Sequence, residues 1–123
     1  MNKEGERSRQ HRRALEIIAS NPQDFIDGLD HPVESALEII LPENGEAVTE
    51  TDVRLVMANG DLHLIEFKLN SDGKYRRRAK QQLEKAKAWY RRNMGFSSEK
   101  IYTHTIFGDN PETLISLKKY GYL

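Results

Sequence analysis

Two segments rich in β-branched and apolar residues, 47–57 and 62–69, are separated by the dipeptide Asn59-Gly60. Asn-Gly between such segments is the strongest short-range signal for a β-hairpin, because both residues reach positive φ angles at low cost. A hairpin places the two segments side by side as antiparallel strands. Both faces of the second segment are partly apolar, so the sequence predicts a sheet covered on both sides.

The segments around this hairpin alternate between helical and strand patterns. They predict an α/β (α+β) fold, with a central mixed sheet of about four strands flanked by helices in the order α-β-β-β-α-β-α. The expected elements are a helix over 8–20, a possible short helix over 23–29, a strand over 33–41, the hairpin strands, a helix over 74–93, a strand over 100–107 and a last helix from Pro111 to about Tyr120.

Length and composition narrow the classes of protein. A chain of 123 residues is typical of one domain, here 1–123 with residues 1–7 expected to be disordered. The absence of cysteine excludes disulfide frameworks, thiolate metal sites and cysteine nucleophiles. No signal peptide and no membrane span is visible, so we expect a soluble, cytoplasmic protein with no membrane partner.

The net charge of zero hides two regions of opposite charge. Residues 1–67 carry 14 acidic and 6 basic side chains, a balance of −8, whereas residues 68–92 carry 10 basic and 2 acidic ones, a balance of +8. A concentrated basic segment suits a polyanion, and an acidic cluster beside it suits a metal ion.

The second hairpin strand ends in Glu66-Phe67-Lys68. Glu66 and Lys68 are two residues apart on a strand and share one face, and Asp52 on the preceding strand can lie near Glu66. Two adjacent carboxylates repel, and one pKa must rise unless a cation intervenes. Magnesium prefers one or two carboxylates together with water and phosphate oxygens, so the pattern predicts a divalent metal site.

One motif resembles the PD-(D/E)XK nuclease superfamily: Asp52, then thirteen intervening residues, then Glu66-Phe67-Lys68 at the end of an apolar strand. The helix–three strands–helix–strand core of that superfamily also matches the expected order of elements. The first motif reads Thr51-Asp52 here, not Pro-Asp. The resemblance implies a restriction-endonuclease-like fold, with Asp52 and Glu66 as ligands of Mg²⁺ (Mn²⁺ as a substitute) and Lys68 as the residue that assists the attacking water.

The resemblance also implies two supporting residues. Several members carry a glutamine on the helix after the lysine, and Gln82 fits because it lies on the expected inward face. Many members carry a glutamate on the first helix, for which Glu16 is the best positional candidate. Glu34 competes if residues 33–41 form a short helix, an alternative that their helix-forming residues leave open.

The segment 74–93 predicts a helix with a basic outer surface. Arg76, Arg77, Arg78 and Lys80 lie near the expected metal site and are the candidate contacts to nucleic-acid phosphates. The alternative is an ordinary amphipathic helix with a solvated charged face.

The histidines give weaker signals. His63 is expected to point away from Glu66, and His104 is a minor candidate for the site. His11 and His31 have no partner at metal-ligand spacing.

Together these patterns predict a metal-dependent nuclease that hydrolyses DNA phosphodiester bonds. A domain this small has little room for a module that reads sequence, so a structure-specific enzyme of the junction-resolving or repair type is expected, and the resemblance implies a possible homodimer. The alternatives are an inactive nucleic-acid-binding or protein-interaction module on the same fold, and an unrelated α+β domain with a charged hairpin.

Overall fold

The computed structural model describes residues 3–122. Its elements are α1 (Lys3–Ser20), the 3-10 turn η1 (Pro22–Asp24), β1 (Glu34–Glu43), β2 (Glu46–Val56), β3 (Leu62–Lys68), α2 (Gly73–Met94), the 3-10 turn η2 (Ser98–Lys100), β4 (Ile101–Phe107) and α3 (Pro111–Lys119). The predicted order of helices and strands is confirmed.

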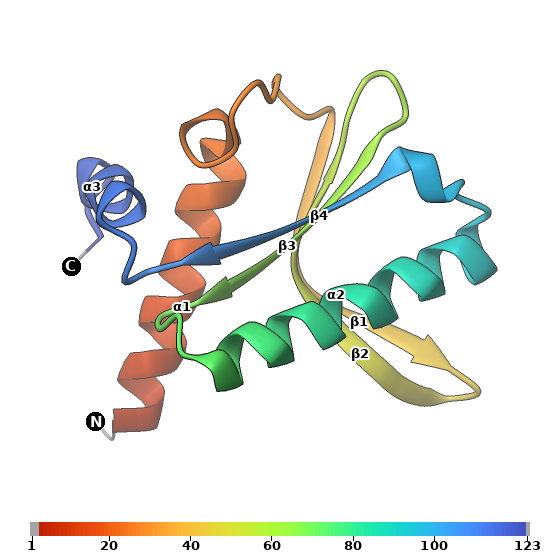
Figure 1. Ribbon diagram of the computed structural model, residues 1–123, viewed down its shortest axis with the longest axis horizontal. Helices are drawn as coiled ribbons and strands as arrows, with labels where there is room; N and C mark the ends of the chain where they lie inside the picture. Colours follow the sequence, from red (N-terminus) through yellow and green to blue (C-terminus); the bar gives the residue numbers. More distant parts are fainter. Residues whose placement is uncertain (1–2, 123) are drawn as a thin grey trace.

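The four strands form one mixed sheet in the order β1-β2-β3-β4. β1, β2 and β3 are antiparallel neighbours, and β4 pairs parallel to β3 after the crossover through α2. The sheet lies between two helical layers: α1 and α3 supply the core on one face and α2 supplies the core on the other (Figure 1).

The side chains of β3 point alternately to the two faces of the sheet, and each face has its own hydrophobic core. Ile65 and Phe67 pack with the buried stripe of α1, and Leu62 and Leu64 pack with Leu83 and neighbouring residues of α2. Nearly all of β3 is therefore buried on both faces, as the sequence predicts for a covered central strand.

Two Asn-Gly turns join the three antiparallel strands. At the β1–β2 turn both Asn44 and Gly45 have positive φ angles, 52° and 81°, as a two-residue type I′ turn requires. At the β2–β3 turn only Gly60 has a positive φ angle, and the Gly60 N–H donates to the Met57 carbonyl. The predicted β2–β3 hairpin is confirmed, with a turn longer than two residues.

Helix α1 begins at Lys3, within the segment 1–7 that was expected to be disordered, and residues 1 and 2 lie outside the described range. Glu, Lys and Arg are good helix formers, which favours a helix that starts this early. The strand expected over 33–41 is confirmed, since Glu34–Glu43 is the edge strand paired with β2, and the alternative of a short helix there does not hold.

The last helix begins at Pro111 as predicted. The Asn110 side chain accepts hydrogen bonds from the N–H groups of Glu112 and Thr113, which closes the first turn. Across residues 3–122, no helix has the length and apolar character that crossing a membrane requires.

Candidate functional site

The carboxylates of Asp52 and Glu66 meet where the β2–β3 ladder ends. The last residues paired through their backbones are Val53 and Ile65. Beyond them, a backbone N–H of each strand donates a hydrogen bond to a side-chain carboxylate of the other strand. The Phe67 N–H donates to Asp52 Oδ2 at 2.8 Å, and the Asp52 N–H donates to Glu66 Oε1 at 3.3 Å. The structure thus brings together the two acids that the sequence pairs.

Burial sets the charge of this acid pair. Glu66 is 1% exposed, and burial, followed by the charge of Asp52, raises its pKa to about 9. Burial also acts to raise the pKa of Asp52, but hydrogen bonds from His11 and the Phe67 N–H lower it below its usual value. At neutral pH the pair therefore holds one proton, on Glu66, and one negative charge, on Asp52.

Lys68 is the last residue of β3 and is partly exposed. It shares the Glu66 side of the strand, and its charge acts to lower the pKa of Glu66, although too weakly to offset burial. The ammonium group therefore lies within electrostatic reach of the acid pair.

His11 also reaches this site, and sequence spacing did not find it. Its Nε2 lies 3.5 Å from Asp52 Oδ2 and 3.4 Å from the Phe67 carbonyl oxygen. The hydrogen bond with Asp52 is the main reason that the pKa of His11 is raised. The signal was present, because His11 continues the buried stripe of Leu15 and Ile18 toward the helix start at helical spacing.

The two glutamate candidates do not join the acid pair. Glu16 is exposed, because the neighbouring Leu15 and Ile17 point into the core and turn it outward. Glu34 begins β1 and forms an ion pair with Arg54 at 3.0 Å. Neither glutamate therefore lies beside the acid pair, and the side chain of α1 that does is His11.

Gln82 lies on the inward side of α2, as predicted. Two turns further along the same side, the Tyr90 hydroxyl accepts from Arg54 of β2, so this side of the helix faces β2. The Gln82 Oε1 atom is buried without a hydrogen-bond partner among the described residues. An unpartnered buried amide oxygen needs a water or a ligand group.

A strained residue faces the site from β1. Leu37 pairs with Val53 and Ile39 with Thr51, so Glu38 lies across from Asp52. Glu38 has a φ of 49°, and its carboxylate forms an ion pair with Arg12 of α1 at 2.6 Å. A left-handed non-glycine residue costs about 1–3 kcal/mol and persists where surrounding contacts impose it.

The predicted phosphate contacts lie on the first turns of α2. All four side chains are exposed: Arg76, Arg77, Arg78 and Lys80. Arg76 and Lys80 line a groove of about 490 Å³ between α2 and β4, and the Arg76 guanidinium lies 4.8 Å from the centre of the Phe107 ring. Further along α2, Tyr90 belongs to the core between α2 and the sheet, and the partly buried Trp89 packs against that core.

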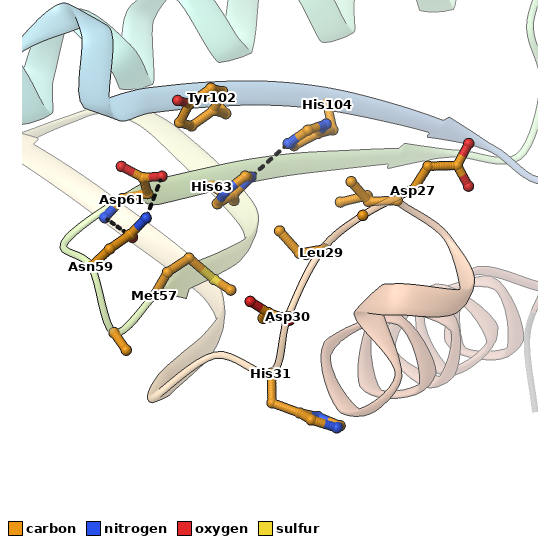
Figure 2. A pocket seen from close by; sticks show the side chains of 13 residues that line it. Asp27, Leu29, Asp30, His31, Met57, Asn59, Asp61, His63, Tyr102 and His104 are labelled. Atoms are coloured by element: carbon orange, nitrogen blue, oxygen red, sulfur yellow. Dashed lines mark hydrogen bonds between the residues drawn. The ribbon is translucent and has the colours of Figure 1, made fainter.

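A second polar cluster occupies a cavity of about 470 Å³ beside the β2–β3 turn (Figure 2). His63 Nδ1 and His104 Nε2 are 2.8 Å apart and share a hydrogen bond, and the Tyr102 ring stacks on His63 at 4.8 Å. Burial lowers the pKa of both histidines, that of His104 to about 4. His63 faces away from Glu66 with Ile65, as the alternation predicts.

The acid pair fits a divalent metal ion by the chemistry of its donors. Two carboxylates that hold a single proton between them present oxygen donors where a cation can replace that proton. Among the side chains that the structure describes, which exclude those of residues 1–7, no three His, Asp or Glu form a group that could hold a metal ion. Asp52 and Glu66 would therefore need main-chain, solvent or substrate oxygens as further ligands.

Comparisons with known proteins supply no relative. No family model, no curated protein and no solved structure matches the chain at a significant level.

Proposed function

We propose that this chain is a metal-dependent nuclease with a restriction-endonuclease-like fold, and that it hydrolyses DNA phosphodiester bonds with Mg²⁺ or Mn²⁺. The observation that carries the proposal is the interlocked pair of Asp52 and Glu66 beside Lys68. As a purely structural device, two acids buried side by side at the end of a strand ladder would cost stability, because repulsion and desolvation both act against folding.

The metal, when bound, would lower the pKa of a coordinated water and polarise a phosphoryl oxygen. Asp52 and Glu66 would hold it through their carboxylate oxygens. The Lys68 ammonium would orient the attacking water and stabilise the negative charge that develops on the phosphate. The buried Gln82 amide oxygen could accept a hydrogen bond from a water at the site.

The basic start of α2 supports a nucleic-acid substrate. Lys80 and Arg76 line the groove against β4, and Arg77 and Arg78 extend the positive charge over the exposed surface. These cations would bind backbone phosphates and so position the scissile bond without reading bases. Structure-specific cleavage, with two copies of the chain on one branched duplex, is the form of activity that we propose.

One observation favours a second candidate, a DNA-binding module without catalysis. Each of the two carboxylates already accepts a backbone N–H, so the pair also serves to close the end of the ladder. In that role Asp52 would need no cation, and the basic surface of α2 would still bind DNA.

Cleavage of branched and linear duplex DNA separates the two candidates. With Mg²⁺ or Mn²⁺ we expect nicking that EDTA abolishes, and a rate that falls at least about 100-fold in Lys68→Ala. The matched control is Lys118→Ala, which removes an exposed ammonium from the last turn of α3. DNA binding that persists in EDTA, with no cleavage under any metal, would instead establish the binding module.

A further inference from the structure

We propose that β4 is a dimerisation strand. The β4 edges of two copies of this chain pair antiparallel about a two-fold axis at His104 and so join two sheets into one. The inference comes from the edges of the sheet and involves neither metal nor DNA, so it can hold or fail independently of the nuclease proposal.

The sheet has two edge strands, and β1 is the protected one. It carries three glutamates, Pro42, a register shift between Leu41 and Pro42, and a left-handed residue at Glu38. Charges, prolines and bulges of this kind keep an edge strand from pairing with another chain. The strained Glu38 thus helps to close this edge.

The other edge strand, β4, has none of these features. Its sequence, IYTHTIF, contains no charged residue, proline or glycine, and it pairs with β3 over its whole length without a register shift. Within the part of the chain that the structure describes, β3 is its one strand neighbour. Tyr102 and Thr103 are exposed. A regular, uncharged and accessible edge is a template for a further strand.

The backbone of β4 is oriented for such pairing. The Gly108 N–H donates to the Lys68 carbonyl at 2.8 Å, so the even-numbered residues of β4 turn their N–H and C=O groups toward β3. Because consecutive strand residues alternate, those of Thr103 and Thr105 point away from β3, toward the open edge. A second strand could bond to both residues.

The sequence of β4 identifies a second copy as the strand that fits. Read outward from His104, each residue has a counterpart of similar kind on the other side, in the pairs Thr103/Thr105, Tyr102/Ile106 and Ile101/Phe107. Antiparallel pairing centred on His104 therefore sets threonine against threonine and each aromatic side chain against an aliphatic one, which are stabilising cross-strand pairs. A two-fold interface requires this self-complementarity, because one surface meets itself.

The helices leave room for the pairing. Ile101 belongs to the core under α2 and Ile106 to the core under α1, and paired positions stay on the same face in this register. Strands lie about 4.8 Å apart, so the two β3 strands, each covered by its own α2, would be about 14 Å apart. Packed helices need only about 8–10 Å.

Such a dimer would present both acid pairs on the same side. A two-fold axis perpendicular to the sheet keeps the two α2 faces together, and the groove lined by Arg76 and Lys80 then adjoins its copy across the joined strands. One basic channel would thus connect two sites. This consequence, unlike the interface itself, rests on the proposed function.

Sedimentation of the full chain in EDTA, without DNA, tests the interface. The wild type should show a concentration-dependent equilibrium between monomer and dimer. Thr103→Lys combined with Thr105→Lys sets like charges opposite each other and should raise the Kd of the dimer at least about tenfold, whereas Thr103→Lys combined with Thr105→Glu sets opposite charges there and should restore it. Ile40→Lys, at an exposed position of β1, is the control and should change nothing.

A single introduced cysteine reports the register, because the chain has none of its own. In His104→Cys the two thiols lie on opposite residues, with Cα atoms about 4.5–5.5 Å apart, within reach of a disulfide. In Tyr102→Cys they lie about 13 Å apart along the strands, beyond that reach. Mild oxidation should therefore cross-link His104→Cys at least about tenfold faster than Tyr102→Cys.

Three results would contradict this interface. A wild type that sediments as a monomer at every concentration would overturn the proposal and leave the β4 edge to a strand of another protein. A dimer that neither threonine double variant changes would have its contact elsewhere. Faster cross-linking of Tyr102→Cys would exclude the axis at His104. None of these results bears on the nuclease proposal, since metal and DNA are absent from all of them.

Discussion

Two polar pairs lie along β3, and burial lowers the charge of both. Near the start of the strand, His63 and His104 are held neutral because burial lowers the pKa of each imidazole. Three residues after His63, burial holds Glu66 in its protonated form beside Asp52. The same physical cause thus removes a proton from one pair and retains a proton in the other.

The difference lies in the charge that each pair retains. Two neutral imidazoles form a donor–acceptor hydrogen bond, at 2.8 Å here, and carry no residual charge. The acid pair keeps one negative charge on Asp52, which His11 meets only at long distance. The uncharged pair has no need of a counter-ion, whereas the pair with residual charge is a candidate place for a cation.

Glu66→Gln should produce the largest effect, with opposite signs on activity and stability. The amide keeps the shape but cannot serve as an anionic ligand, so metal-dependent cleavage should fall at least about 100-fold. Without metal, the variant should be more stable than the wild type by about 1–3 kcal/mol near pH 8, because no buried carboxylate has to stay protonated or lie beside Asp52.

Cleavage assays and urea unfolding in EDTA measure the two effects. Glu16→Gln, which changes an exposed carboxylate on α1, is the control and should alter neither. A Glu66→Gln protein that is less stable than the wild type in EDTA would show that the acid pair is a purely structural device.

His63→Leu should affect stability alone, by a smaller amount. The change leaves the half-buried His104 without its hydrogen-bond partner, which costs about 0.5–1.5 kcal/mol. Cleavage per folded molecule should not change, because the imidazole pair and the acid pair point to opposite sides of β3. Thermal unfolding compared with His31→Leu, an exposed position, measures the cost. A loss of cleavage in folded His63→Leu would end the distinction between the two pairs.

The two pairs should change the free energy of unfolding in opposite directions as pH rises. The pKa of Glu66 rises from 4.5 to about 9 on folding, so the native state binds the extra proton and stability falls as pH rises through that interval. The pKa of His104 falls from 6.5 to about 4, so its contribution is lost as pH falls below 6.5. The raised pKa of His11 adds to the fall above pH 6.5.

Metal-free unfolding between pH 5 and 9 measures these slopes, which amount to at most about 1.4 kcal/mol per pH unit for each proton. Glu66→Gln should flatten the fall above pH 6.5 and leave the part that comes from His11. An unchanged alkaline slope in that variant would mean that Glu66 is ionised in the native protein.

The sequence was sufficient for features that depend on near neighbours along the chain. Asn59-Gly60 joins two β-branched segments, and strand alternation then places Asp52 beside Glu66, a pairing that spans fourteen residues. The cap at Asn110 and the start of α3 at Pro111 follow from local chemistry in the same way. The order of helices and strands follows from such signals.

Long-range packing was the part that the sequence did not show. The contact of His11 with the Phe67 carbonyl spans 56 positions, and that of His63 with His104 spans 41. No spacing rule covers such distances, since α1 and β4 reach β3 only through the tertiary fold. Glu16 lies away from the acid pair for a local reason, because the apolar stripe of α1 faces the sheet and Glu16 is on the exposed side of the helix.

The antiparallel meander of β1, β2 and β3 has a consequence for how the molecule assembles. Its strands pair across short turns, whereas β4 meets β3 only after the chain has returned along the whole of α2. Closing a short loop loses less chain entropy than closing a long one. The two carboxylates therefore belong to the part of the molecule with the lowest entropic barrier to assembly, and the basic groove, which needs both α2 and β4, belongs to the part with the highest.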